Sequence, residues 1–401
     1  MRIDIEQILN DEKLVVHFQP IISTNGRILF GFESLIRGVS DDGSLIAPYV
    51  LFENAKQQQL TLELDKLART LAIKNFEPLF RQNNKLILFV NFEPKLIDTF
   101  EIGNYLFYGE LQRLRIPYQN VVLEVKEDAI TDTSRLKTFC DHYRNLGFNI
   151  ALDDFGVGQS SFDRISIVRP DIIKIDRSLI SDIGSNKIHQ EIVSAICKMC
   201  HNIGALALAE GVENVDESVH SLRLGAKLMQ GFYFAKPSQN PLQDDIKSKL
   251  SNVNDTYKST LKAIKEEEEE FHATAKDVED AFCASLLGTK EIRAWNNFAK
   301  VLLDKFENIE ALYLIDKDSK QIGPTLMRAQ TRSFYEPTED GHDYSLKEYH
   351  IRVKDAINGK HLTEPYLSLA SGSLCRTYAS RISINNDIYI FCMDFVVSKA
   401  S

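Results

Sequence analysis

Short runs of aliphatic and β-branched residues alternate with longer amphipathic stretches over roughly the first 240 residues of the chain. The stretches 61–76, 134–146 and 188–203 have helical apolar spacing, and β-rich runs follow them. Repeated strand and helix units predict a parallel sheet, because a parallel connection needs a crossover segment. Their number fits a closed β/α barrel. The predicted strands are 28–36, 86–91, 121–125, 149–153, 171–175, 205–210 and 227–230.

Most of these runs end in or near an acidic residue. The carboxyl ends of barrel strands converge on one mouth, so polar side chains there are interpreted first as functional. Carboxylates gathered at one mouth repel each other unless a positive charge, such as a divalent metal ion, lies among them. Oxygen ligands without His or Cys favour Mg²⁺ or Mn²⁺ over zinc. The residues concerned are Glu33, Asn91, Glu124, Asp153, Asp154, Lys174, Asp176 and Glu210.

This cluster has enough ligands for two metal ions, with a lysine beside them. Two neighbouring divalent ions promote phosphodiester hydrolysis, because they activate water and stabilise the leaving oxygen. Any one of these carboxylates alone is more often a helix cap or part of a surface ion pair. Their joint placement at successive strand ends favours a metal site.

The composition changes after Pro241. Residues 244–285 are rich in Lys and Glu and poor in turn formers, which predicts a solvated connecting helix. The pattern of residues 286–401 predicts one helix, 292–306, followed by consecutive strands. This order favours a small α+β domain with an antiparallel sheet. The predicted strands of this part are 310–315, 365–369, 373–384 and 388–397.

Charge and composition exclude several classes of protein. Lys and Arg number 47 against 57 Asp and Glu, and this net charge of -10 disfavours a protein that binds a nucleic-acid polymer. No apolar run is long enough to span a membrane, and the chain starts without a secretory signal. Its six cysteines are sparse for this length and suit reduced thiols. We therefore expect a cytoplasmic protein.

Eight short motifs, in this order and spacing, resemble the EAL domain of cyclic di-GMP phosphodiesterases. The resemblance covers about residues 1–240, which places an EAL domain at residues 1–243 and implies a TIM-like β/α barrel. The motifs are Gln19-Pro20-Ile21, Glu33-Ser34-Leu35 with Arg37, Val90-Asn91, Leu123-Glu124-Val125-Lys126-Glu127, Asp153-Asp154-Phe155-Gly156, Lys174-Ile175-Asp176, Ala209-Glu210-Gly211-Val212-Glu213, and Gln230-Gly231-Phe232 through Lys236-Pro237.

The resemblance also implies a role for each matched residue. Glu210 would position or deprotonate the attacking water, and Lys174 would orient that water or stabilise phosphoryl charge. The implied reaction is hydrolysis of cyclic di-GMP to linear pGpG. The implied ligands of the first metal are Glu33, Asn91, Glu124 and Asp153, those facing a second metal are Asp154 and Asp176, and the ligand contacts are Gln19, Arg37, Glu213 and Gln230.

Two positions depart from the family pattern in the loop after the aspartate pair. Val157 stands where the family has threonine, and Gln159 stands where it has an aromatic residue. The family's loop anchor, Glu127, is kept, although Lys126 beside it replaces a threonine. Valine cannot make the hydrogen bond of threonine, so the loop is expected to hold Asp154 less well.

Two interpretations of function follow. The first is a protein that binds cyclic di-GMP with metal and hydrolyses it weakly or not at all. The second is a fully active, metal-dependent phosphodiesterase regulated by the C-terminal domain. The C-terminal pattern resembles a PAS-like or CACHE-like domain, which implies a sensory or dimerisation module, an unknown small ligand and a homodimer. A purely structural cap is the alternative.

Overall fold

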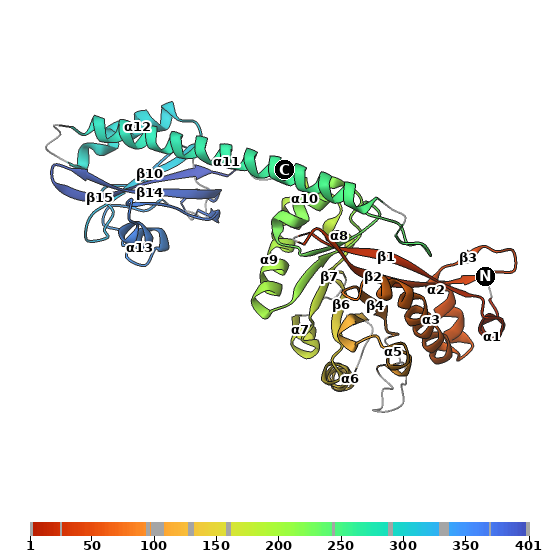
Figure 1. The fold of residues 1–401 in the computed structure, drawn as a ribbon. Helices are drawn as coiled ribbons and strands as arrows, with labels where there is room; N and C mark the ends of the chain where they lie inside the picture. Colours follow the sequence, from red (N-terminus) through yellow and green to blue (C-terminus); the bar gives the residue numbers. More distant parts are fainter. Residues whose placement is uncertain are drawn as a thin grey trace. The chain divides into compact units, whose positions relative to one another are not determined.

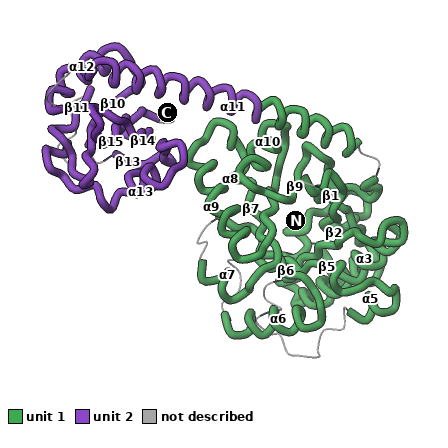
Figure 2. Tube along the Cα trace, turned by 60° about the vertical axis from the view of Figure 1, so that its left-hand side comes forward, with its two compact units in different colours: residues 1–260 green, residues 261–401 purple. Residues whose placement is uncertain are grey.

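The computed structural model divides into two compact units, Met1–Thr260 and Leu261–Ser401 (Figure 2). The described residues are 3–24, 26–93, 97, 108–126, 132–157, 162–242, 245–287, 292–328, 337–368 and 370–397. No helix in these ranges is long and apolar enough to cross a membrane.

Eight strands of the first unit close a barrel, in the order β1-β9-β8-β7-β6-β5-β4-β2 with β2 pairing back to β1 (Figure 1). Strands β2, β4, β5, β6, β7, β8 and β9 run parallel, and β1 is antiparallel to both of its neighbours. The predicted barrel is confirmed. The strands are β1 (Leu14–Ser23), β2 (Ile28–Val39), β4 (Ile87–Asn91), β5 (Val121–Lys126), β6 (Asn149–Phe155), β7 (Ile172–Ile175), β8 (Leu206–Ala209) and β9 (Leu228–Gln230), while β3 (Leu45–Ile46) extends the sheet beside β2.

The strand β1 is absent from the sequence-based prediction, although it completes the ring. It pairs with β2 from Leu14↔Gly38 to Ser23↔Ile28, and with β9 at Ile21↔Gln230. Pro20 lies within it, and a proline inside a run normally argues against a strand that is paired on both sides.

Helices pack on the outside of the barrel, and their ends follow clear local signals. At α9 the Asn186 side chain accepts a hydrogen bond from the His189 backbone N–H, and Gly204 ends the helix at φ +79°. The apolar face of α9 buries Val193, Ile196, Cys197 and Cys200. The helices are α1 (Ile5–Asn10), α2 (Pro48–Gln57), α3 (Thr61–Gln82), α5 (Tyr108–Leu114), α6 (Thr133–Leu146), α7 (Phe162–Val168), α8 (Arg177–Ile180), α9 (Lys187–Ile203) and α10 (Val215–Leu224), with a 3₁₀ turn, η1, at Tyr118–Asn120.

The second unit has an antiparallel sheet in the order β11-β10-β15-β14-β12, with β13 also on β14. The helix α11 (Ile246–Ser285) begins in the first unit and continues into this one. The predicted α+β class is confirmed for the second unit. Its other elements are η2 (Ile292–Ala294), α12 (Trp295–Lys305), β10 (Ile309–Ile315), β11 (Leu326–Met327), α13 (Glu348–Asp355), β12 (Lys360–Leu362), β13 (Tyr366–Leu367), β14 (Leu374–Ile384) and β15 (Asp387–Val396).

Aromatic side chains form the centre of this second core. Phe282 of α11 stacks on Phe391 of β15 with ring centroids 3.9 Å apart. Trp295 is fully buried and donates from Nε1 to the Ile322 carbonyl oxygen at 2.8 Å. Trp295 is thus a core residue of its own unit.

A carboxyl group lies buried in the same sheet. Asp394 of β15 is 3% exposed, and its Oδ1 accepts hydrogen bonds from Thr377 Oγ1 at 2.6 Å and Tyr313 OH at 3.4 Å. Burial raises the pKa of Asp394 to about 7, although these hydrogen bonds oppose the shift. The folded state therefore holds a proton there that the unfolded chain loses near pH 4.

We predict that Asp394→Asn removes a pH dependence of stability. A pKa raised by folding lowers the free energy of unfolding as pH rises from about 4 to 7, by about 4 kcal/mol at most. The variant keeps the Oδ1 acceptor but does not titrate, so its stability relative to wild type should rise across this interval. Denaturant unfolding at several pH values measures this difference. Asp387→Asn, at the exposed start of β15, is the control, and its free energy of unfolding should depend on pH as that of wild type does. The assignment would be contradicted if the free energy of unfolding of Asp394→Asn changed with pH in parallel with wild type.

Candidate metal centre

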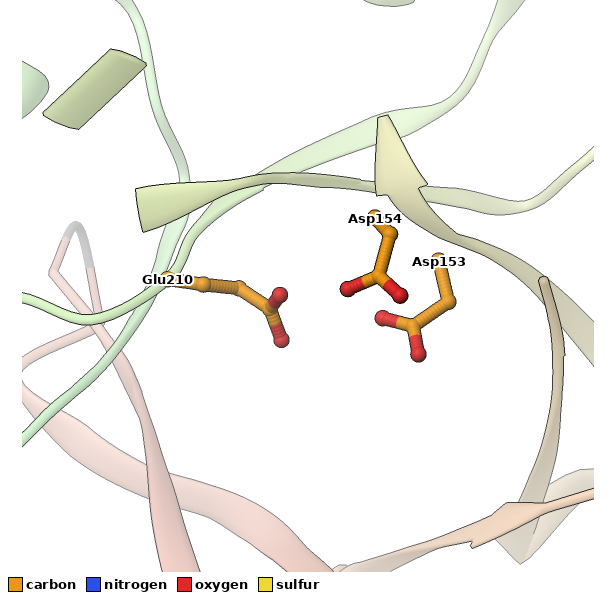
Figure 3. Close-up of side chains that lie close together, drawn as sticks. All are labelled: Asp153, Asp154 and Glu210. Carbon is orange, nitrogen blue, oxygen red and sulfur yellow. The ribbon is translucent and has the colours of Figure 1, made fainter. Parts of the chain in front are cut away.

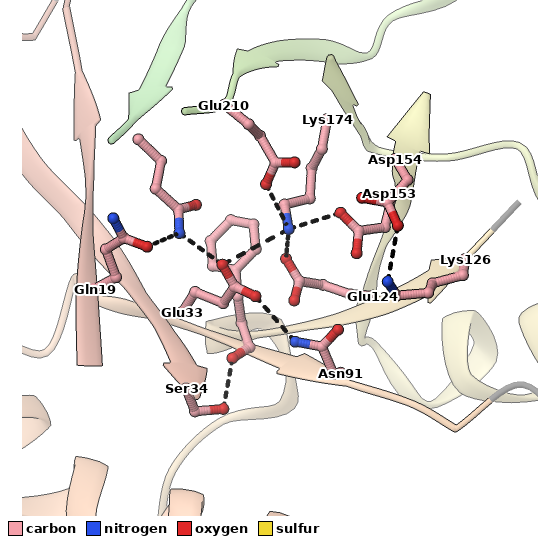
Figure 4. A network of polar contacts seen from close by, with 12 residues as sticks. Gln19, Glu33, Ser34, Asn91, Glu124, Lys126, Asp153, Asp154, Lys174 and Glu210 are labelled. Carbon is pink, nitrogen blue, oxygen red and sulfur yellow. Dashed lines mark hydrogen bonds and ion pairs between the residues drawn. The ribbon is translucent and has the colours of Figure 1, made fainter. Parts of the chain in front are cut away.

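The polar residues predicted at the strand ends converge on one mouth of the barrel (Figure 4). Each comes from a different strand, except for the pair that ends β6. Six of them line a cavity of about 590 Å³, a volume typical of small-molecule sites: Glu33, Asn91, Asp153, Asp154, Lys174 and Glu210. The set comprises Glu33 of β2, Asn91 of β4, Glu124 of β5, Asp153 and Asp154 of β6, Lys174 of β7, Glu210 after β8 and Gln230 of β9.

Lys174 is the central cation of this mouth and is 1% exposed. Its Nζ lies 2.6 Å from Glu124 Oε1 and 2.7 Å from Glu210 Oε1. Asp153 Oδ1 is 2.8 Å away and Glu33 Oε2 is 3.8 Å away. One buried ammonium group thus faces four carboxylates, which leaves the cluster short of positive charge.

The pKa values of the cluster reflect this shortage. Burial raises the pKa of Glu210 to about 8, and it raises the pKa of Glu124 well above its usual range. Burial alone would lower the pKa of Lys174, but its carboxylate neighbours outweigh that effect and raise it. Burial alone would raise the pKa of Asp153, but Lys174 outweighs it and lowers that pKa. The cluster therefore favours the uptake of a proton or of a further cation.

The donor set fits a hard divalent metal ion. Asp153, Asp154 and Glu210 each offer one oxygen, and these atoms lie within 4.8 Å of one another (Figure 3). Glu124 Oε2 is buried and has no hydrogen-bond partner among the described residues. Buried carboxylate oxygens without a donor are what Mg²⁺, Mn²⁺ or Ca²⁺ would bind.

A local distortion of β6 lets two adjacent aspartates face the same mouth. Successive side chains of a regular strand point to opposite faces. Here the β6–β7 register shifts between Leu152 and Phe155, and Asp154 adopts φ +56°, which aspartate tolerates better than most residues. Gly156 follows at φ +106°, where an added Cβ would collide with Leu179.

Amide side chains tie Glu33 to the neighbouring strands. Asn91 Nδ2 donates to Glu33 Oε1 at 3.0 Å, and Gln230 Nε2 donates to Glu33 Oε2 at 2.6 Å. Gln230 Nε2 also lies 3.0 Å from Gln19 Oε1. Gln230 Oε1 is buried without a partner among the described residues, so it is an acceptor open to a ligand.

Other residues predicted for the site lie apart from this cluster or outside the described chain. Asp176 caps α8, where its Oδ1 accepts a hydrogen bond from the Ser178 backbone N–H at 2.7 Å. Glu213 is exposed and forms an ion pair with Arg177. Arg37 is partly buried, and its guanidinium donates to the Ile36 carbonyl oxygen at 2.8 Å. Val157 is 41% exposed. Glu127 and Gln159 lie outside the described residues.

The sequence-based prediction missed one wall of the cavity. Asp65 and Arg69 of α3 form a buried ion pair there, and the Arg69 guanidinium lies 3.8 Å from the centre of the Phe92 ring. Asp65 Oδ1 also accepts from the Glu93 N–H at 3.4 Å, just after Asn91. A charged pair four residues apart, beside the apolar positions of α3, is the sequence signal that could have identified this wall.

We predict that Lys174→Met destabilises the metal-free barrel and makes it depend on metal. Loss of one partner from a buried ion cluster typically costs about 3–5 kcal/mol. Denaturation in a chelator should show this loss, and Mn²⁺ should restore more stability to the variant than to wild type. Lys137→Met removes an exposed lysine whose Nζ lies 2.7 Å from Asp141, and serves as control. Equal stability of Lys174→Met and wild type in chelator would contradict the prediction.

Comparisons with known proteins agree with this geometry. A sequence model described as the EAL domain matches residues 3–237. The EAL-domain protein YkuI of Bacillus subtilis (strain 168) is 23% identical over 397 residues, which cover 96% of this chain and 95% of YkuI. The cyclic di-GMP phosphodiesterase PdeF of Escherichia coli (strain K12) is 30% identical over 247 residues, which cover 60% of this chain and 32% of PdeF.

Solved structures show the same fold. The crystal structure of B. subtilis YkuI, in complex with cyclic di-GMP and calcium, has a TM-score of 0.78 at 22% identity and covers 99% of this chain and 100% of that one. A standalone EAL protein from Vibrio cholerae O395, in its cyclic di-GMP-bound form, has a TM-score of 0.50 at 28% identity and covers 56% of this chain and 92% of that one. The family match spans more than half of the sequence, so this chain belongs to the EAL domain family.

Proposed function

We propose that this protein binds cyclic di-GMP together with a divalent metal ion at the barrel mouth, and hydrolyses it to pGpG slowly or not at all. The observation that carries the proposal is the buried carboxylate cluster around Lys174, at the wall of a cavity of about 590 Å³. Membership of the EAL family supports cyclic di-GMP as the ligand.

In this proposal the metal is Mg²⁺ or Mn²⁺, which when bound would activate water and stabilise charge on the phosphate. Its ligands would be Glu33, Asn91, Glu124 and Asp153, with Asp154 and Asp176 facing a second ion. The structure supports the first set more strongly, because Asp176 is engaged as a helix cap.

The chain's own residues would carry the remaining steps of hydrolysis. Glu210 Oε1 faces Lys174, so Oε2 is the oxygen left to accept a proton from the attacking water. Its raised pKa suits a group that accepts a proton near neutral pH. The water oxygen would form the new bond to phosphorus and its proton would pass to Glu210. One phosphodiester P–O bond would break, and the leaving oxygen would keep the electron pair and take up a proton to become a hydroxyl of pGpG. Lys174 would hold the carboxylates in place and offset charge on the phosphoryl group.

Cyclic di-GMP carries phosphates and guanine edges, and the proposed contacts match both. Arg37 suits a phosphate, because its guanidinium is a fixed fork of donors. Gln19, Glu213 and Gln230 suit guanine edges, and Gln230 Oε1 is the acceptor that already lacks a partner. Glu213 would have to leave Arg177 to take part.

Weak hydrolysis is proposed because of the segment that follows β6. The Val157 N–H donates to the Asp154 carbonyl oxygen at 3.4 Å, so Val157 closes the turn that presents Asp154. A valine side chain adds no hydrogen bond to this turn, and Gln159 adds no aromatic ring. Asp154 is therefore held less firmly than in the family pattern.

A fully active phosphodiesterase regulated by the C-terminal unit is the second candidate. It is favoured by the complete set of carboxylate, asparagine and lysine side chains at the mouth. Both candidates bind the same ligand and differ only in turnover.

We predict that wild-type protein binds cyclic di-GMP with Mg²⁺ or Mn²⁺ but releases little pGpG, and that Val157→Thr with Gln159→Tyr raises turnover at least ~10-fold. Calorimetry measures affinity and chromatography measures pGpG in the same full-length preparation. Val301→Thr, at an exposed valine of α12, is the control for the valine change. Robust wild-type turnover that the double variant leaves unchanged would favour the active enzyme.

We further propose that the C-terminal unit is a PAS-like sensory or dimerisation domain with its own small ligand, in a homodimer. Its antiparallel sheet, with α11 and α12 in the same core, supports such a module. Light scattering of the full chain should then give twice the mass of the 45.7 kDa protomer. A monomer at micromolar concentration would rule out the dimer.

A further inference from the structure

A second lysine reaches the carboxylates from the opposite side to Lys174 (Figure 4). Lys126 is the last residue of β5, and the strand register pairs it with Asp153 of β6. Its Nζ lies 2.8 Å from Asp154 Oδ2, and its side chain lines the same cavity. This lysine stands where the sequence resemblance leads one to expect a threonine, which carries no charge.

The Lys126 ammonium contacts one oxygen of a carboxylate that a metal ion would use. Asp154 is one of the three residues whose oxygens lie within 4.8 Å of one another, with Asp153 and Glu210. Lys174 already contacts the other two. The three carboxylates thus face two protein cations. A metal ion at Asp154 would have to bind a carboxylate that already has an ammonium group at Oδ2.

We propose that Lys126 is a tethered cation that takes the place of a second divalent ion at Asp154. The site then holds one metal ion tightly, binds its ligand and lacks the second ion that hydrolysis needs. This inference rests on the proposed function and adds a cause of weak turnover that lies on β5, separate from the loop after β6.

An ordinary surface ion pair is the alternative explanation of this contact. The two side chains are 48% and 44% exposed, and such a pair contributes little to stability. Competition with metal does not require a strong pair, however, because the strand register places the Lys126 backbone beside Asp153, the neighbour of Asp154. An ammonium group that lines this cavity would also repel a second ion nearby.

The test is a calorimetric titration of metal-free, full-length protein with Mn²⁺ alone. Wild type should bind one ion tightly, and Lys126→Thr should bind a second ion at least ~10-fold more tightly than wild type does. Lys126→Arg keeps the charge and should behave as wild type. Lys137→Thr removes a lysine from a comparable exposed pair with Asp141 on α6, and should also behave as wild type.

The site of the gained ion is checked with a double variant. Asp154→Asn combined with Lys126→Thr should abolish the second binding event. Three results would each overturn the inference. Wild type could bind two Mn²⁺ ions with similar affinity, Lys126→Thr could show no gain in affinity for the second ion, or Lys126→Arg could show the same gain as Lys126→Thr. Cyclic di-GMP affinity is measured separately. A wild-type protein that did not bind cyclic di-GMP would refute the proposed function. The Mn²⁺ titration would still decide the role of Lys126.

Discussion

The ion cluster of Lys174 is the interaction on which the barrel mouth depends. A single ammonium group, fully enclosed, is shared among four carboxylates from four different strands and their ends. Such a cluster contributes little net stability by itself, because each charge loses its hydration. It instead fixes the position of each carboxylate, so the ligands of a metal ion are in place before that ion arrives.

The backbone of β6, and not the ion cluster, directs Asp154 towards the barrel mouth. A regular strand would turn Asp154 away from the mouth, and the positive φ of Asp154 with the register shift before Phe155 turns it inward. Gly156 completes the turn where a side chain would collide with Leu179. The distortion therefore brings a second aspartate to the mouth, and both Lys126 and Val157 act on that residue.

Much of the fold and of the mouth follows from sequence, because strand ends converge in any β/α barrel. Glu33, Glu124, Asp153, Lys174 and Glu210 are predictable together for this reason. Contacts that depend on side-chain direction are not predictable in this way. Asp176 stands at a strand end as expected, yet its carboxylate turns to cap α8. The ion pair of Lys126 can be predicted only once the register of β5 against β6 is known. Strand β1 is hard to predict because a proline inside a strand usually signals the edge of a sheet or the end of a strand.

The pairing of β1 with β9 has a consequence for how the chain is made. Gln19 and Gln230 meet across this seam although 211 positions separate them in sequence. During synthesis β1 emerges early and its outer edge stays unpaired until β9 leaves the ribosome. Closure of the ring is thus a contact of very long range, which slows folding and leaves a strand edge open to aggregation. The edge of β1 is therefore exposed until the last strand of the barrel is complete.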